Sequence, residues 1–243
     1  MKIKFIIILG LLFLIGCSKS STELFELSKE NLKNNQDDLA VKNLEKLLEK
    51  YPNDSLASQA LYKLSTIYLN WQNDPASGLG ALDKLVKTYP ESKQAKQAKL
   101  EIEEFPDYIL NKTESLRKKE MVKEALDHLM YLTENHSNHQ LISKAQYMLG
   151  DIYMNDLRDF KTAIQEYRKV IENHKGSTQE PHALFMIGYI YANVLNDMQS
   201  AKIEYEEFLN RFPEHELSPS VKFEIEYLGK SVDEIPALKH ITT

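Results

Sequence analysis

Apolar residues recur three or four positions apart in successive stretches between residues 22 and 228, the spacing that places them on one face of an α-helix. The stretches come in pairs, with a polar turn inside each pair. The opening pattern Ala60-x-Tyr62-x-Leu64 returns in related form, beginning at Ala98, Ala145, Ala183 and Val221. These starts lie 38, 47, 38 and 38 residues apart. The repetition predicts an all-α protein, an α-solenoid of about five helical hairpins with a C-terminal capping helix.

Two features of the repeats predict how each hairpin is built. Small residues stand where the two helices of a hairpin would cross, at Ser28, Ser65, Gly150, Gly188, Ala40, Ala163 and Ala201. An aspartate precedes the second helix, at Asp74, Asp159 and Asp197. An aspartate at this place accepts hydrogen bonds from the unpaired N–H groups of the first helical turn. We therefore interpret these carboxylates as helix caps and not as catalytic groups.

The interval of 47 residues breaks the period and contains Pro106. A helix that starts near Ala98 is expected to be interrupted at Pro106 and to resume from Tyr108. This interval exceeds the usual 38 residues by nine. Nine residues are about 2.5 helical turns, which would rotate a continuous apolar face away from the core. We therefore expect the solenoid to be irregular at Pro106, where an N-terminal half, residues 23–105, joins a C-terminal half, residues 106–229. Bending at this joint is a hypothesis.

The hairpins resemble the tetratricopeptide repeat (TPR). In that family a small residue in the first helix is followed by an alanine early in the second helix and by a proline that ends it. The match is carried by Ser28, Ala40 and Pro52, and by Gly188, Tyr191, Ala201 and Pro213. The chain departs from the family in its 38-residue period and in Lys175, which stands where the proline is expected. The resemblance implies stacked hairpins that bind other proteins.

The N-terminus has the features of an export signal. Two lysines precede an apolar run, residues 5–15, that is too short to span a bilayer as a helix. Leu14-Ile15-Gly16-Cys17 resembles the lipobox of bacterial lipoproteins. That resemblance implies a signal peptide at residues 1–16, acylation of Cys17 with chains such as palmitate, and a lipidated tether at residues 17–22. The alternative is that Cys17 merely ends an ordinary secretory signal.

Charge and candidate chemistry narrow the class of function. The net charge of −6 argues against a protein that binds nucleic-acid phosphates. The single cysteine excludes an internal disulfide. His136 and His139 are the only closely spaced histidines, and they lie in an expected loop without a third ligand. The sequence has no phosphate-binding loop or catalytic motif, so we expect no metal, no cofactor and no enzymatic activity.

The main functional candidate is a stripe of residues on the first helices. In TPR proteins the corresponding positions face the concave groove. The resemblance carries them onto Phe25, Lys29, Tyr62, Asn70, Tyr147, Asn155, Phe185, Tyr189 and Asn193. Aromatic side chains supply contact area and asparagines hydrogen-bond a peptide backbone, so this stripe predicts a partner-binding groove for a polypeptide. Alternatively, the aromatic residues only pack neighbouring first helices together, and the asparagines only end those helices.

The lipobox, the chain length and the extended repeats together resemble the lipoprotein family of the outer-membrane β-barrel assembly machinery (BamD). The resemblance implies a lipid anchor in the outer membrane, on the periplasmic face, in an organism with two membranes. It implies envelope partners such as a β-barrel assembly subunit or unfolded outer-membrane proteins. The periplasmic TPR protein of the Tol-Pal system is similar more distantly. An adaptor for peptidoglycan enzymes or Tol-Pal-type machinery remains the alternative function, and the tail, residues 230–243, is either a docking segment or frayed.

Overall fold

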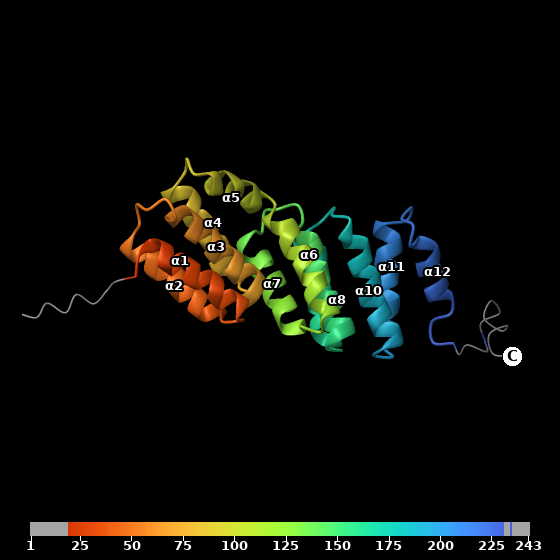
Figure 1. The fold of residues 1–243 in the computed structure, drawn as a ribbon. Coiled ribbons are helices and arrows are strands. Elements are labelled where there is room, and N and C mark those ends of the chain that lie inside the picture. The colour runs from red at the N-terminus through yellow and green to blue at the C-terminus, as the bar shows by residue number, and fades with distance from the viewer. Residues whose placement is uncertain (1–18, 231–233, 235–243) are drawn as a thin grey trace, which may run out of the picture. The chain divides into compact units, whose positions relative to one another are not determined.

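The computed structural model describes residues 19–230 and residue 234, and within these it contains helices and no strand. The α-helices are α1 Ser21–Lys33, α2 Asp37–Lys50, α3 Ala57–Ile67, α4 Pro75–Thr88, α5 Lys93–Glu103, α6 Phe105–Lys118, α7 Val122–Asn135, α8 Ile142–Asp151, α9 Phe160–Asn173, α10 Gln179–Asn193, α11 Met198–Arg211 and α12 Ser218–Glu226 (Figure 1). Two π-helical segments, η1 Tyr68–Gln72 and η2 Ile152–Asp156, continue α3 and α8. The predicted all-α fold is confirmed.

Contacts divide the described chain into two compact units. Unit 1 contains residues 19–72 and 77–99, and unit 2 contains residues 73–76, 100–230 and 234. In unit 1, α1 pairs with α2, which packs on α3. In unit 2, α6 pairs with α7, α8 with α9, and α10 with α11, and α12 packs on α11 as a closing helix. This arrangement is TPR-like, as predicted. The expected division after residue 105 stays a prediction, because these units are defined by contacts and not by repeats.

The chain is irregular beside Pro106, but not at the residue predicted. Helix α5 ends at Glu103, and α6 begins at Phe105 with Pro106 in its first turn. A proline is tolerated there because the N–H that it lacks would have no partner inside the helix. The helix break therefore precedes Pro106, and the expected restart at Tyr108 is corrected to Phe105.

The hairpin turns share one backbone conformation. Non-glycine residues with φ between 52° and 61° occur at Asn35, Asn73, Glu120, Arg158 and Asn196. After two of these turns, Asp159 accepts a hydrogen bond from the N–H of Thr162 at 3.1 Å, and Asp197 accepts one from the N–H of Ser200 at 3.0 Å. These bonds confirm two of the predicted helix caps. The hydrogen bonds from Ser200 also hold the pKa of Asp197 below its ordinary value.

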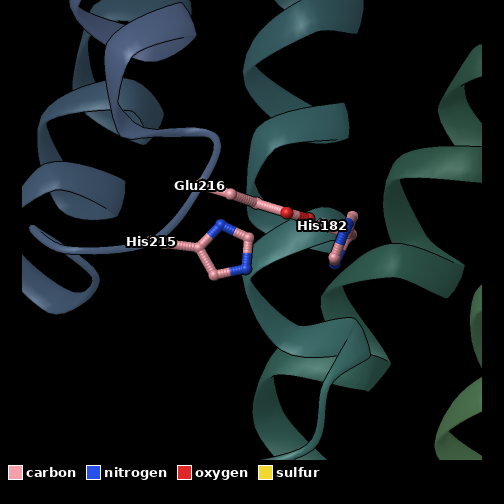
Figure 2. Close-up of side chains that lie close together, drawn as sticks. All are labelled: His182, His215 and Glu216. Carbon is pink, nitrogen blue, oxygen red and sulfur yellow. The ribbon is translucent and has the colours of Figure 1, made fainter.

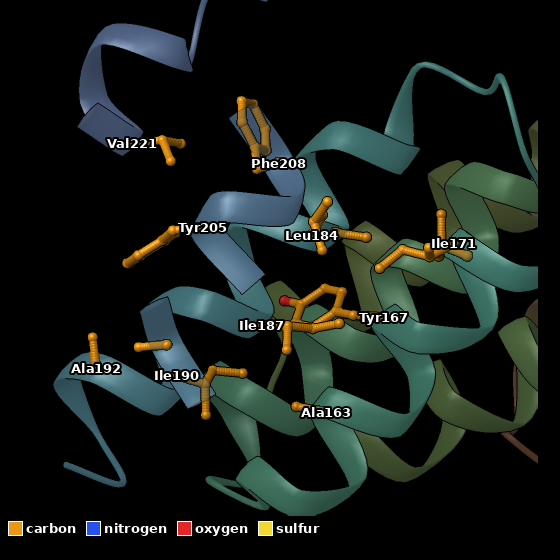
Figure 3. Packing of buried hydrophobic residues seen from close by; sticks show 13 residues of the cluster. Ala163, Tyr167, Ile171, Leu184, Ile187, Ile190, Ala192, Tyr205, Phe208 and Val221 are labelled. Carbon is orange, nitrogen blue, oxygen red and sulfur yellow. The ribbon is translucent and has the colours of Figure 1, made fainter. Parts of the chain in front are cut away.

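The core of unit 2 depends on glycine at two helix crossings. A Cβ atom on Gly150 would lie 2.5 Å from Cε1 of Tyr167, and one on Gly188 would lie 2.5 Å from Cε1 of Tyr205. Both tyrosines are fully buried, beside Leu184, Ile187 and Phe208 (Figure 3). At the matching places in unit 1, Ser65 and Leu82 are buried instead. The predicted crossing positions are thus all buried, and those at Gly150 and Gly188 are sterically tight.

Several predicted segments lie outside the described residues. They are the signal peptide at residues 1–16, Cys17 with the beginning of its tether, and all of the tail after Lys230 except residue 234. Among the helices that the structure does describe, none has the length and apolar character needed to cross a membrane.

Candidate partner-binding groove

A cavity of about 650 Å³ lies on unit 2, on the face formed by the first helices of its hairpins. Helix α6 contributes Glu114, Arg117 and Lys118 to one side of it, and α10 contributes Gln179 and His182. The full lining is Glu114, Arg117, Lys118, Lys144, Tyr147, Met148, Asp151, Asp156, Gln179 and His182. We call this space the first-helix groove. Tyr147 is the one predicted groove residue that lines it.

Tyr147 lies between two neighbouring repeats. Its ring centroid is 5.2 Å from that of Tyr167 on α9 and 6.4 Å from that of His182 on α10. The side chain is half-buried, and burial raises the pKa of its hydroxyl above the ordinary value. Tyr147 therefore packs between repeats and also lines the groove, so the two interpretations offered by the sequence are compatible at this residue.

The floor of the first-helix groove is polar and already hydrogen-bonded. The Tyr167 hydroxyl donates a hydrogen bond to Oδ1 of Asp151 at 2.6 Å. Burial raises the pKa of Asp151, and the hydrogen bond from Tyr167 acts in the opposite direction. Nε of Arg117 lies 2.7 Å from Oδ2 of Asp156. These contacts fix the position of polar atoms before any partner binds, which lowers the entropic cost of association.

Exposed lysines on the rim complement this floor. Lys118 and Lys144 line the groove, and both are exposed. The groove thus offers an aromatic side chain, a methionine and exposed positive charges beside hydrogen-bonded polar groups. This combination suits a polypeptide that carries apolar and acidic groups.

The other predicted residues of unit 2 are accessible but lie outside the lining of the first-helix groove. Phe185 and Tyr189 on α10 are half-buried, and their ring centroids lie 6.4 Å apart. Phe185 also lies 6.0 Å from the buried Tyr205. Asn155 and Asn193 are exposed, and Nδ2 of Asn193 donates to the Tyr189 carbonyl at 3.3 Å. The bond made by Asn193 is the one expected of a residue that ends a helix.

The predicted residues of unit 1 are partly exposed, and they do not line the cavity found there. The Lys29 ammonium lies 5.6 Å from the Phe25 ring centroid and also pairs with Glu26. Tyr62 is half-buried and Asn70 is exposed in η1. A cavity of about 800 Å³ instead lies between α2 and α4 over α3. It is on the face of the second helices, which we call the second-helix groove.

Two features of unit 2 escaped the sequence analysis. Arg117 and Asp156 are 39 positions apart, close to one repeat, but no motif marks them as partners. His182, His215 and Glu216 offer ligand atoms that all lie within 4.8 Å of one another (Figure 2). His182 and His215 are 33 positions apart in the sequence, and this separation hid the group, because only His136 and His139 are close in sequence.

Comparison with known proteins supports the fold and a family resemblance. Residues 18–100 match the family described as outer membrane lipoprotein (YfiO), and residues 144–177 and 182–215 each match the tetratricopeptide repeat. No significant match was found among curated proteins.

Solved TPR structures are also similar. MamA from Desulfovibrio magneticus RS-1 is 17% identical, with a TM-score of 0.36, over 82% of this chain and 98% of that one. YrrB, described as a TPR protein with an unusual peptide-binding site, is 19% identical, with a TM-score of 0.38, over 84% and 92%. A TPR protein from Parabacteroides merdae ATCC 43184 is 16% identical, with a TM-score of 0.37, over 86% and 73%. At this level these likenesses carry no functional argument. The chain thus has a TPR-like fold with two matched tetratricopeptide repeats, and it resembles the BamD-like outer membrane lipoproteins over its N-terminal part.

Proposed function

We propose that this protein is a membrane-anchored scaffold that binds protein partners during the assembly of outer-membrane β-barrel proteins. The match of residues 18–100 to an outer membrane lipoprotein family carries the proposal. The repeats supply a protein-interaction surface, since stacked helical hairpins expose long, continuous faces. The partners are envelope proteins, either a β-barrel assembly subunit or unfolded outer-membrane proteins.

The lipid anchor is proposed at Cys17, the residue just before the region matched by the family. Lys19 is the first residue that the structure describes, two positions after Cys17. Two residues of extended chain reach at most about 7 Å, so acylation of Cys17 would hold unit 1 close to the bilayer. Attachment of several acyl chains would make release negligible. The protein is then bound to the outer membrane and faces the periplasm.

The first-helix groove of unit 2 is the proposed binding site for the client polypeptide. Tyr147 provides its aromatic contact, and Phe185 and Tyr189 extend an accessible aromatic surface along α10. The remaining predicted residues, Phe25, Lys29, Tyr62, Asn70, Asn155 and Asn193, would add contacts on the first helices. Lys118 and Lys144 would attract acidic groups of the client.

Charge reversal on the groove rim tests this function. The variant Lys118→Glu/Lys144→Glu is expected to lose most co-purified partner after crosslinking in intact cells and solubilisation of the membranes. Lys161→Glu/Lys175→Glu makes the same charge change at exposed residues that do not line the groove and should retain the partner. Equal loss in both variants would contradict groove binding.

The identity of the crosslinked partner separates the proposed function from its alternative. Recovery of a β-barrel assembly subunit or of unfolded outer-membrane proteins supports β-barrel assembly. Recovery of a peptidoglycan hydrolase or a Tol-Pal component would instead support an adaptor of envelope machinery. In parallel, Cys17→Ala should move the protein from the membrane pellet to the soluble fraction after a salt wash. Retention in the pellet would contradict the lipid anchor.

A further inference from the structure

Two histidines and a glutamate converge at the junction of α10 with the loop between α11 and α12 (Figure 2). Each of His182, His215 and Glu216 offers one ligand atom, and these three atoms lie within 4.8 Å of one another. The imidazole ring centroids are 5.3 Å apart, with the ring planes nearly perpendicular at 86°. Both histidines are half-buried, whereas Glu216 is exposed. Small side-chain rotations would bring all three atoms to one ion.

The two imidazole rings are not equally ready to bind a metal ion, because their hydrogen bonds differ. Nδ1 of His182 lies 2.9 Å from the carbonyl oxygen of Thr178, so it donates its proton there and leaves the lone pair of Nε2 available. Nδ1 of His215 lies 3.2 Å from the N–H of Leu217 and accepts from it. Coordination through Nε2 of His215 requires the other tautomer and costs this long hydrogen bond. His182 is therefore the better prepared ligand.

Equivalent loops elsewhere in the chain show which contact of His215 is ordinary loop structure. Two hairpins earlier, Nδ1 of His139 accepts from the N–H of Leu141 at 3.3 Å, as His215 does from Leu217. In unit 1, Asp54 makes the same contact with the N–H of Leu56 at 2.8 Å. The loop therefore needs only an acceptor at this place. The pairing with a second histidine and a carboxylate occurs at His215 and not at His139.

We propose that His182, His215 and Glu216 bind a divalent transition-metal ion of the zinc class. Imidazole nitrogens with one carboxylate suit Zn²⁺ and its neighbours, whereas Mg²⁺ and Ca²⁺ prefer sets of oxygen ligands. Three protein ligands leave a fourth tetrahedral position for water or for a group of a bound partner. Since His182 also lines the first-helix groove, the ion would lie at its margin. It would also connect α10 to the loop that leads into α12.

Calorimetric titration of the mature chain with ZnCl₂ tests the site. The protein is purified in detergent without a polyhistidine tag. We expect saturable binding of one ion per chain, a loss of affinity of at least about tenfold in His182→Ala, and a comparable loss in His215→Asn. Asparagine retains an oxygen acceptor for Leu217, as Asp54 does for Leu56, so the loop should keep its fold. His139→Asn is the matched control and should bind Zn²⁺ like the wild type.

Introducing the same His, His and Glu set one hairpin earlier provides a second test of the site. Lys144, Ser177 and Thr178 occupy the places of His182, His215 and Glu216, each 38 positions earlier. The variant Lys144→His/Ser177→His/Thr178→Glu should therefore bind a second ion. Zn²⁺ should also raise the melting temperature of the wild type and not that of His215→Asn. Absence of saturable binding in the wild type, or equal weakening by His139→Asn and His215→Asn, would overturn the proposal.

Discussion

The second-helix groove of unit 1 has a counterpart in unit 2 that is largely filled. The cavity between α2 and α4 has a volume of about 800 Å³, and the one between α7 and α9 has about 230 Å³. Leu61 and Ala81 line the first of these. Gln146 and Glu166 stand at the matching places in the second.

Hydrogen bonding explains why the unit 2 cavity is smaller. Nε2 of Gln146 donates to Oε2 of Glu166 at 2.5 Å, and the Lys169 ammonium donates to the same carboxylate at 2.8 and 2.9 Å. One repeat later, Arg168 forms two hydrogen bonds with Glu204, at 2.6 and 3.2 Å. Gln146 and Glu166 thus link α8 to α9 at the smaller cavity, and the Arg168–Glu204 pair bridges the successive second helices α9 and α11. In unit 1, Leu61 and Ala81 stand where Gln146 and Glu166 fill the unit 2 cavity, and they leave this surface open, although both units share one helical periodicity.

The largest predicted effect is at the crossing of Gly150 with Tyr167, whose matching places in unit 1 hold Ser65 and Leu82. Gly150→Ala should lower the free energy of unfolding by about 2 kcal/mol, because its Cβ would meet the buried Tyr167 ring and overpacking outweighs the gain in helix propensity. Chemical denaturation followed by circular dichroism measures this change.

Combining Gly150→Ala with a second substitution, Tyr167→Leu, tests whether the tyrosine ring causes this loss of stability. In Tyr167→Leu, which carries the residue type found at Leu82 of unit 1, the added methyl group has room, so Gly150→Ala should cost little. The double-mutant cycle should then give a coupling energy of at least about 1 kcal/mol. A coupling energy near zero would mean that the ring does not set the need for glycine.

The next effect is the pH dependence of stability that the buried His128 causes. The matching place in unit 1 holds Asn43, which does not titrate. His128 is fully buried, and Nε2 has no hydrogen-bond partner among the described residues. Burial lowers the pKa of His128. Among the charged groups that face its ring, Lys112 lowers the pKa further, whereas Asp127 and Asp74 raise it. The folded state therefore keeps this ring neutral at pH values where the unfolded chain binds a proton.

The sign of the pH dependence follows from that lowered pKa. Stability from His128 is present above the unfolded pKa of about 6.5 and is lost as the pH falls toward the lower folded pKa. The loss is at most about 1.4 kcal/mol per pH unit. Denaturation curves between pH 7.5 and 5 should show a smaller decrease for His128→Leu than for the wild type. Identical decreases would show that another group causes the acid sensitivity.

The smallest effect has the opposite sign and lies in unit 1. Gly80 is in the interior of α4, and a Cβ atom there would meet nothing within 4 Å. Gly80→Ala should therefore raise the free energy of unfolding by up to about 1 kcal/mol through helix propensity alone. The same denaturation assay checks this increase. Destabilisation by this variant would imply that the second-helix groove is tighter than the structure shows.

Much of the fold could be predicted because the repeats constrain it at several levels. Helical periodicity gave the hairpins, and small residues such as Gly150 marked the crossings that the structure finds buried. The break near Pro106 was displaced because a proline fits the first turn of α6 as well as it ends a helix. The turn residues with positive φ were not anticipated, since Glu120 and Arg158 are not residues that favour this conformation.

The candidate sites were harder to predict because they combine residues from different repeats. Tyr147 was expected in the groove, but Arg117 and Asp156 meet only after α6 and η2 are packed. His182 and His215 are likewise brought together only when the loop after α11 packs against α10. A single sequence shows which positions recur, but not which charged side chains from neighbouring repeats will form a pair.

Site-specific photocrosslinking in intact cells tests the central claim most directly, that clients bind the first-helix groove. A photoreactive amino acid is placed at residue 147 in that groove, at residue 165 on the exposed side of α9, or at residue 46 in the second-helix groove of unit 1. The account predicts a strong adduct with an envelope protein from residue 147 and little from the other two. Adducts of equal strength at all three positions, or adducts only from residue 46 or 165, would contradict it.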